Sequence, residues 1–572
     1  MSDISQLEHL IHLGHYAEAR ARAKELLQSN GSELRIKQLY ALALSKSGVP
    51  EAAQEYLESI IRDHPDDPET MGILGSIYKE LFKKNQSSKY AILARDTYDK
   101  NFQITKSYYT GINAASMSML AGQSRRGKEI AQEVLTVLKD PENDFWESAT
   151  QAEAYLLLKE RPRAVETYLH ARKLATTDWG KINSVYNQLW LLKHYLPVPN
   201  EVLKAFSPPV VVAFVGHMID HPTRKHKRFP PSIEAEVKNA LVNALRTLNA
   251  KIGYCSLACG GDILFAEAME EVGGELNLFL PFNQADFIDV SVRFAGEHWV
   301  ERFDRLVSRY PVTYLTQDNY EGHADLFLLQ TSIIFGLSVL RSIGNHKEPT
   351  LISVLSERDL KRKMGGTRDT IALWPFQKNH ITVNPDVYLR DEAEIIFEEV
   401  HPPPVISDRP VLYFVRADLS SEQKLNNALL AEMETSSLPP IVLDLRDDYL
   451  VAGFKTIFSA MEFCEVVTRT MIKPFQQKVS LRLSLHVGPL RIKTEVIKQT
   501  LSGEVIDVIE RLHNLALPGS IHATGIVAAI LALEGKKYSF DYVDTLSAPG
   551  DAKALDVFKV HIHHVLSPGA SE

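Results

Sequence analysis

The chain has 572 residues, of which 45% are hydrophobic and 24% are charged, and its formal net charge is −9. This length predicts about three or four domains, with ample apolar material for buried cores. The acidic balance argues against nucleic-acid binding, which usually requires a basic patch. No stretch of about 18 apolar residues stands out, so we expect neither a transmembrane helix nor a membrane partner.

The cysteines and the first residues both favour a cytoplasmic protein. Cys255, Cys259 and Cys464 are too few for a disulfide framework. The chain begins with Met-Ser-Asp-Ile-Ser-Gln, which is polar and lacks the apolar core of a signal peptide. Cys255 and Cys259 do not have CxxC spacing, and no cluster of Cys or His completes a metal site. We therefore expect buried thiols in the middle of the chain.

Residues 1–206 are predicted to form an all-α repeat of the tetratricopeptide type. Apolar and small residues recur with helical spacing, and turns follow one another every ~34 residues, which is the tetratricopeptide period. The segment 63–68, Asp-His-Pro-Asp-Asp-Pro, marks one such turn, because proline ends one helix and starts the next. Stacked helix pairs usually bind a protein on their concave face, so we expect a protein partner here. A plain helical bundle is the alternative.

Three stretches of this region carry a more specific resemblance. They are Leu-Gly-Ser-Ile-Tyr-Lys at 74–79, Tyr-Tyr-Thr-Gly-Ile-Asn-Ala-Ala at 108–115 and Trp-Glu-Ser-Ala-Thr at 146–150. Together they resemble the TRAF-binding region of the apoptosis-signal-regulating MAP-kinase-kinase-kinases, which implies a protein-docking scaffold. The chain has no Val-Ala-Ile-Lys strand, no His-Arg-Asp loop and no Asp-Phe-Gly, so the kinase activity of that family is not expected.

Proline-rich joints divide the remainder. They lie at 196–200, 207–209 and 401–404, and such segments act as semi-rigid spacers. We accordingly expect three domains, at 1–206, 208–400 and 408–566.

The middle domain is predicted to be a doubly wound, Rossmann-like α/β fold. The continuous apolar run 210–215 is typical of a buried parallel strand and ends in a glycine turn at Gly216. A second glycine turn, Gly260-Gly261, opens a helix in the stretch 254–267, and a third lies at 365–367. In such folds the ligand crevice lies beyond the carboxyl ends of the strands.

This segment resembles the SLOG superfamily over residues 210–376. The resemblance rests on Phe-Val-Gly-His at 214–217, Ser-Leu-Ala-Cys-Gly-Gly-Asp at 256–262, Leu-Pro-Phe at 280–282 and Gly-Gly-Thr at 365–367. It implies that the domain binds a nucleotide-derived small molecule. The residues expected to bind it are Gly216, His217, Arg224, Gly260, Gly261, Asp262, Glu267, Gly366, Thr367 and Asp369.

Two features decide what chemistry this pocket is expected to perform. Unpaired N–H groups at the helix that begins near Asp262 would make an anion site, and Arg224 and Arg228 of the neighbouring basic loop are suited to phosphates. A solvated charge run is the alternative for the loop. Glu267 has the spacing of the catalytic Glu in the phosphoribohydrolase branch, but Ile263-Leu264 replaces Gly-Thr there. Ligand binding is therefore favoured over hydrolysis. The alternative to a functional role for Glu267 is that its side chain packs in the fold or caps a helix.

The C-terminal domain is predicted to be α+β. Strands are expected at 411–415, 441–445 and 481–487, and an amphipathic helix at 502–512. Short stretches at 446–449, 485–489, 511–512 and 517–521 resemble a class III nucleotide cyclase homology domain. The resemblance implies a ferredoxin-like fold and a homodimer, whereas a ferredoxin-like domain unrelated to cyclases is the alternative.

Cyclase chemistry requires two carboxylates that hold metal ions. By the resemblance, the first carboxylate position is occupied by Arg416, with Asp418 two residues later, and the second fits Asp447 with Asp448 beside it. Mg²⁺ or Mn²⁺ is expected only if the domain is active, with Asp418, Asp447 and Asp448 as ligands; otherwise no cofactor is expected.

Of the remaining cyclase positions, one keeps the expected residue and two have a different one. Asp507 holds the place of the transition-state Asn, Arg511 matches the arginine of the same helix, and Leu443 replaces the base-reading Lys. The catalytic set of an active enzyme would be Asp447, Asp507 and Arg511. With Arg416 and Leu443 at key positions, the sequence favours a signalling scaffold that senses a ligand over the alternatives, an active cyclase or a nucleotide hydrolase.

Overall fold

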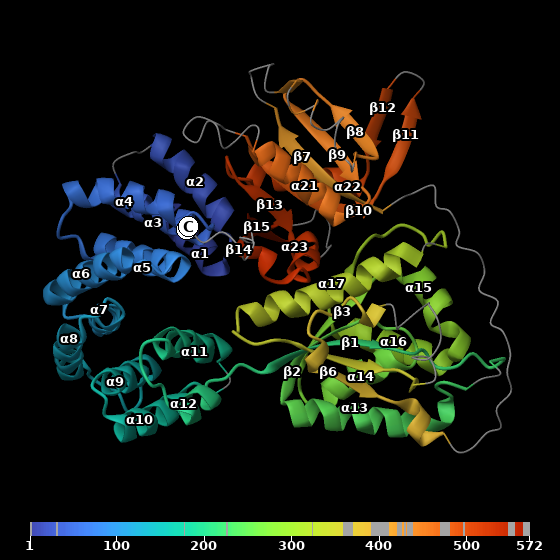
Figure 1. Cartoon of the computed structure of the whole chain (residues 1–572), viewed down its shortest axis with the longest axis horizontal. Helices are drawn as coiled ribbons and strands as arrows, with labels where there is room; N and C mark the ends of the chain where they lie inside the picture. The colour runs from blue at the N-terminus through green and yellow to red at the C-terminus, as the bar shows by residue number, and fades with distance from the viewer. Residues whose placement is uncertain are drawn as a thin grey trace, which may run out of the picture. The chain divides into compact units, whose positions relative to one another are not determined.

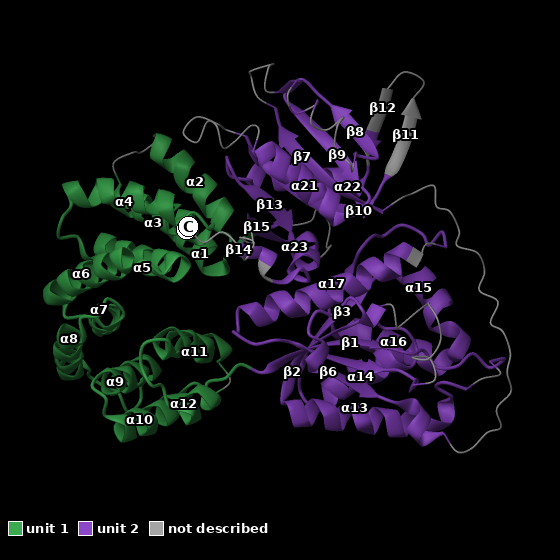
Figure 2. Cartoon of the chain, in the orientation of Figure 1, with its two compact units in different colours: residues 1–208, 542–544 green, residues 209–541, 545–572 purple. Residues whose placement is uncertain are grey.

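The computed structural model describes residues 3–29, 33–176, 178–224, 227–322, 324–357, 370–389, 411–419, 426–427, 429, 431, 439–469, 481–495, 498–546 and 555–563. The chain divides into two compact units (Figure 2). Unit 1 comprises residues 1–208 with 542–544, and unit 2 comprises 209–541 with 545–572. Both large sheets belong to unit 2, apart from residues 542–544 of one strand. The division into three domains remains a prediction.

Unit 1 is an array of consecutive helices (Figure 1), which confirms the predicted helical repeat. The helices are α1 (Asp3–Leu13), α2 (Tyr16–Ser29), α3 (Leu34–Lys46), α4 (Pro50–Asp63), α5 (Pro68–Asn85), α6 (Ser88–Thr105), α7 (Tyr108–Leu120), α8 (Ser124–Val137), α9 (Phe145–Leu157), α10 (Arg161–Leu174), α11 (Trp179–Lys193) and α12 (Asn200–Ala205). Small residues let neighbouring helices approach closely. A Cβ atom at Gly75 would lie 2.9 Å from the ring of Tyr98, and one at Gly111 would lie 2.8 Å from that of Phe102.

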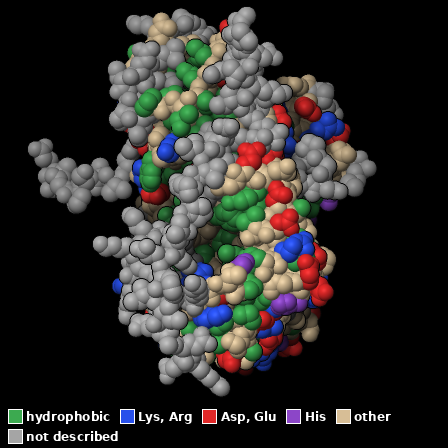
Figure 3. Space-filling model, turned by 90° about the vertical axis from the view of Figure 1, so that its right-hand side faces the viewer, with side chains coloured by type: hydrophobic (Ala, Val, Ile, Leu, Met, Phe, Trp, Pro, Cys, Tyr) green, Lys and Arg blue, Asp and Glu red, His purple; other side chains and the backbone are tan. Residues whose placement is uncertain are grey.

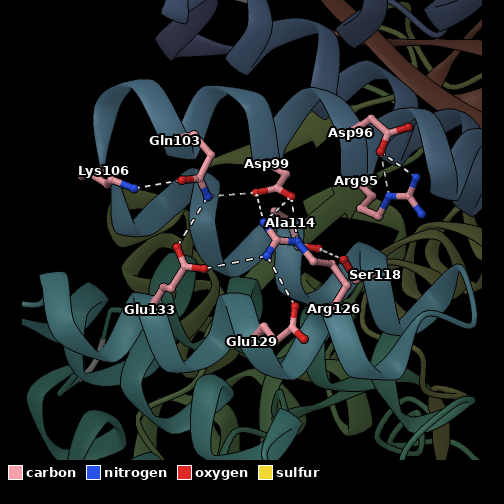
Figure 4. A network of polar contacts seen from close by, with 10 residues as sticks. All are labelled: Arg95, Asp96, Asp99, Gln103, Lys106, Ala114, Ser118, Arg126, Glu129 and Glu133. Carbon is pink, nitrogen blue, oxygen red and sulfur yellow. Dashed lines mark hydrogen bonds and ion pairs between the residues drawn. The ribbon is translucent and has the colours of Figure 1, made fainter.

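Ion pairs join alternate helices of this array (Figure 4). Arg126 of α8 donates three hydrogen bonds to the two carboxylate oxygens of Asp99 of α6, at 2.7, 2.9 and 3.0 Å, and its guanidinium lies near Glu129 and Glu133. These side chains are partly exposed, so each pair contributes little stability by itself. The bidentate geometry nevertheless fixes the spacing between the two helices.

Unit 2 contains a six-stranded parallel sheet in the order β4-β3-β2-β1-β5-β6. Its strands are β1 (Val210–Gly216), β2 (Ala250–Cys255), β3 (Glu275–Leu280), β4 (Val312–Tyr314), β5 (Thr350–Val354) and β6 (His380–Val383). The helices α13 (Glu234–Leu248), α14 (Gly261–Glu271) and α16 (Glu297–Arg309) share one hydrophobic cluster with the sheet, and α17 (Ala324–Ile343) shares another. The strand order reverses at β1, where open parallel sheets bind ligands.

Helix α17 corrects one expectation. Within the described residues, 325–343 is a stretch long and apolar enough to cross a membrane by length and composition, although none was expected. In the structure 56% of this stretch is buried. The helix packs against the parallel sheet and against α23 (Gly525–Ala532), so its apolar character is accounted for by two buried faces.

The second large sheet of unit 2 is mixed, in the order β14-β15-β13-β10-β7-β9-β8. Its strands are β7 (Val411–Asp418), β8 (Val442–Leu445), β9 (Tyr449–Phe454), β10 (Leu483–Pro489), β13 (Ile521–Thr524), β14 (Tyr538–Leu546) and β15 (Leu555–Ile562). Strands β10 and β13 run parallel, whereas β7 is antiparallel to both β9 and β10. Helix α21 (Ile457–Val467) packs on one face and α22 (Glu504–Leu515) on the other, and β11 (Arg491–Glu495) pairs with β12 (Lys498–Ser502).

The two large sheets are joined through helices. Helix α17 crosses α23 at Gly336, where a Cβ atom would overlap the backbone carbonyl of Ala529. Apolar side chains of both helices, including Ile333 and Val527, belong to one buried cluster. This cluster connects the parallel sheet with the mixed sheet within unit 2.

Candidate functional site

A cavity of about 390 Å³ opens at the carboxyl ends of β1 and β2. Aromatic side chains from three elements form its apolar walls, namely Phe214, Phe287 and Phe327. Its polar lining comprises Ser256, Asp262, Ser291, Gln330, Thr331 and Thr370. Figure 3 views unit 2 from the side of these strand ends and shows hydrophobic side chains around a hollow. The volume falls within the range of small-molecule pockets.

The glycine turns at Gly216 and Gly260-Gly261 meet beside this cavity. A Cβ atom at Gly216 would lie 2.8 Å from the Phe214 ring, and one at Gly260 would lie 2.4 Å from the backbone nitrogen of Ile219. Gly260 also has φ +96°, which favours glycine. The third predicted turn, with Gly366, Thr367 and Asp369, lies outside the described residues.

These close approaches explain the glycines without a ligand. The Gly261 N–H donates to the carbonyl of His217 at 2.9 Å, and the Ile263 N–H donates to the carbonyl of Ala258 at 3.4 Å. Two of the N–H groups that were expected to hold an anion at the start of α14 are thus already paired inside the protein. The glycine pattern here is a requirement of the contact between two turns.

Asp262 is the one carboxylic acid among the described residues that line the cavity. Its carboxylate accepts a hydrogen bond from the Ala258 N–H at 3.1 Å, and the side chain is buried. Burial raises the pKa of Asp262 to about 7, and the Ala258 N–H only partly offsets this effect. Burial also raises the pKa of Cys259 to about 12 and that of Cys255 above its usual value, so both thiols stay protonated. Asp262 is therefore the group of this cavity that changes charge near neutral pH.

Helix α17 supplies a polar pair that the sequence analysis did not identify. The Gln330 amide nitrogen donates to the Ser256 hydroxyl at 2.8 Å and to the carbonyl of Phe279. Thr331 follows it on the same cavity wall. The signal in the sequence that could have identified this pair is a glutamine and a threonine inside an otherwise apolar stretch. These contacts orient the amide and tie the helix to the ends of β2 and β3.

Of the predicted ligand-binding residues that the structure describes, Gly216 and Asp262 line the cavity, whereas Gly260, Gly261, His217, Arg224 and Glu267 do not. Arg224 lies 3.5 Å from Asp220, and Asp220 also accepts hydrogen bonds from the backbone of the basic loop. His217 is buried and its backbone belongs to the contact between the turns. Glu267 lies in an ion-pair cluster, described next.

Glu267 is held by cations of two neighbouring helices. Arg302 of α16 donates to both carboxylate oxygens, at 2.8 and 2.9 Å, and Arg305 and Lys238 lie at 3.2 and 3.1 Å. The carboxylate is thereby committed to joining α13, α14 and α16. This geometry corresponds to the packing alternative for Glu267.

In the mixed sheet, both carboxylate oxygens of Asp418 likewise accept hydrogen bonds from neighbouring residues. One oxygen accepts from His513 at 2.6 Å, and the other accepts from the backbone N–H and the guanidinium of Arg482, at 3.1 and 2.9 Å. Burial raises the pKa of Asp418, but the hydrogen bonds from His513 and Arg482 outweigh it and lower the value to about 2. The expectation that Asp418 holds a metal does not fit this arrangement, because both oxygens already have cationic or donor partners.

Arg416, which was expected at the first carboxylate position, also has partners in the fold. Its guanidinium stacks over the Tyr449 ring at 4.0 Å from the centroid and lies 3.6 Å from Glu510 of α22. Asp447 and Asp448 lie exposed in the turn between β8 and β9, and Asp507 is exposed on α22, which also carries Arg511. Over the part of the chain that the structure describes, no group of three His, Cys, Asp or Glu side chains is placed to hold a metal ion.

Comparisons with known proteins support the first region most directly. Residues 15–118 match the model of the family described as Tetratricopeptide Repeats-Sensor, so this region is tetratricopeptide-like. No curated protein matches the chain.

Several solved structures are similar to parts of the chain. A thermophilic TPR protein from Thermus thermophilus is 16% identical over 33% of this chain and 97% of its own, with a TM-score of 0.28. The guanylate cyclase domain of RhGC from Catenaria anguillulae, solved with GTP, is 14% identical over 27% of this chain and 98% of its own, with a TM-score of 0.23. The adenylyl cyclase CyaB from P. aeruginosa is 14% identical over 28% of this chain and 97% of its own, with a TM-score of 0.24.

Proposed function

We propose that the protein is a signalling scaffold that senses a nucleotide-derived small molecule in the cavity of its parallel sheet. The observation that carries the proposal is the cavity at the carboxyl ends of β1 and β2, with the buried Asp262 in its lining. Ligands of open parallel sheets bind at this place, beside the reversal of strand order. The SLOG-like motifs of this Rossmann-like domain agree with that location.

In this proposal the helical repeat docks a protein partner. Stacked tetratricopeptide pairs leave an extended face for binding, and the family match over residues 15–118 falls in this part of the chain. The resemblance to a TRAF-binding region supports a signalling partner rather than a metabolic one.

The cyclase-like, ferredoxin-like domain serves in this proposal as a structural and dimerising element without cyclase activity. Catalysis would require two carboxylates to hold a metal ion. Arg416 occupies the first position, and the nearby Asp418 is bonded to His513 and Arg482. We expect no cyclic nucleotide from ATP or GTP with Mg²⁺ or Mn²⁺. Product formation that is lost in Asp447→Ala would refute this part of the proposal.

Thermal unfolding of the full chain tests the sensing function. A ligand that binds the folded state raises the apparent stability, by about 2.7 kcal/mol at a hundred times its Kd. Nucleosides, nucleotides and dinucleotides are screened at about 1 mM, far above a micromolar Kd. We expect at least one of them to raise the melting temperature of the wild type, and less so that of Asp262→Ala. If none of these compounds shifts the wild type, the sensing function is wrong.

A further inference from the structure

We infer that the cavity recognises its ligand through an uncharged nitrogen heterocycle of the nucleobase type, held by Asp262, Ser256 and Gln330, and not through a phosphate. The inference rests on the proposed sensing function and specifies which part of the ligand the cavity contacts.

Charge is the first argument. The described residues that line the cavity include one carboxyl group, that of Asp262, and no Lys, Arg or His. A phosphate placed here would face a carboxyl group in a buried site, where repulsion between like charges is strongest. Arg224, one of the two arginines that were expected to reach a phosphate, instead lies against Asp220.

The backbone at the start of α14 gives the second argument. Phosphate cradles use unpaired N–H groups at the first turn of a helix, together with glycines that let the phosphate approach. Here the N–H groups of Gly261 and Ile263 donate to carbonyls of the protein, and Gly216 and Gly260 are required by the contact between the two turns. Two N–H groups of this helix terminus are therefore already bonded inside the protein and are not available to a phosphate.

The lining instead suits a flat, polar ring. Phe214, Phe287 and Phe327 provide apolar walls, and the cavity of about 390 Å³ is large enough for a small heterocyclic ligand. At its polar side lie a carboxyl group, a hydroxyl group and an amide whose nitrogen is already bonded to Ser256 and Phe279. The amide oxygen and the Asp262 carboxyl group are acceptors for ring N–H or amino groups, as in recognition of flipped-out bases.

Isothermal titration of the full chain separates the two modes of binding. The probes are the four common ribonucleosides, their 5′-monophosphates, ribose 5-phosphate and inorganic phosphate. We expect at least one nucleoside to bind within about threefold of its monophosphate, and the two probes without a base to give no binding. Loss of a hydrogen bond to a buried polar group should weaken binding of that nucleoside by roughly tenfold or more in Asp262→Ala and Gln330→Leu.

The matched control is Asp304→Asn, which alters an exposed carboxyl group on α16 and should bind like the wild type. If Asp262→Ala fails to fold, Gln330→Leu and Thr331→Val carry the test. Binding of monophosphates and ribose 5-phosphate without any binding of nucleosides would overturn the inference while leaving the sensing function intact. Failure of all nucleosides and nucleotides to bind would overturn both.

Discussion

Asp262 should make the stability of the protein depend on pH. Its pKa rises from the ordinary 3.8 to about 7 on folding, so between these values the folded state binds more protons than the unfolded state. The free energy of unfolding must therefore fall as pH rises through this window, by an amount of roughly 4 kcal/mol. We expect Asp262→Asn to be less stable than or equal to the wild type near pH 4 and more stable above about pH 7, as measured by thermal unfolding across that range.

The exposed Asp304→Asn serves as the control, because its curve should run parallel to that of the wild type. A difference between Asp262→Asn and the wild type that stays constant with pH would mean that this carboxyl group does not titrate in the window.

Asp418 should have the opposite effect on the pH dependence, so that the free energy of unfolding rises with pH. Its hydrogen bonds from His513 and Arg482 lower its pKa from 3.8 to about 2, despite the opposing effect of burial. This stabilisation is present above about pH 4 and is lost as pH falls toward 2, and it amounts to about 2 kcal/mol. Asp418→Asn should lower the melting temperature at pH 7 and flatten the acid limb of the stability curve. The exposed Asp447→Asn should do neither.

These residues also show what sequence can predict at a single position. The pattern located Gly216, Gly260 and Asp262 at one end of the sheet, because glycine turns after apolar strands depend on local chemistry. It could not tell a glycine needed by a neighbouring turn from one needed by a ligand. Nor could it show that Glu267 and Asp418 bond to cations distant in sequence, at Arg302 and Arg482.

At the scale of elements, helix α17 both lines the cavity and packs against the mixed-sheet region. Its residues Phe327, Gln330 and Thr331 line the cavity, and Gly336 lies against α23 of the mixed sheet. Its apolar composition was visible in the sequence, but its partners were not, since a helix buried on two faces carries no amphipathic pattern. A ligand that shifts this helix would change the packing of α23.

Substitution at the crossing tests this packing. In Gly336→Val the new side chain would overlap the carbonyl of Ala529, so the helices must separate. Such overpacking should cost about 3 kcal/mol and lower the melting temperature of unit 2 by several degrees. The same change at Gly344, where the nearest other atom lies 4.0 Å from the new Cβ, is the matched control. Equal melting temperatures for the two variants would contradict the close crossing.

For the whole molecule, the order of the regions was accessible from the sequence. Helical periodicity, apolar strand runs and proline-rich joints indicated a helical repeat, then a doubly wound α/β region and an α+β region, and the structure has a helical array followed by a parallel and a mixed sheet. The merging of the two sheets into one unit was not accessible, because it depends on a close contact between α17 and α23, which are distant in sequence. This contact also means that the C-terminal region cannot be assayed alone without exposing the apolar surface of α23.

The final prediction is that the full chain forms a homodimer through β8. This strand lies at the end of the seven-stranded sheet, and Ile441, Leu443 and Leu445 are exposed by 52%, 45% and 48%. An apolar strand at the end of a sheet favours pairing with a second copy, and a self-complementary patch closes at two copies.

Sedimentation velocity tests this dimer. At about 10 µM, a concentration that populates a dimer of micromolar affinity, the wild-type chain should sediment as a dimer. Leu443→Lys combined with Leu445→Lys should give a folded monomer, because both lysines would lose their hydration in the interface, whereas Lys substitution of the exposed Val387 should leave the dimer intact. A wild-type chain that sediments as a monomer would rule out this interface.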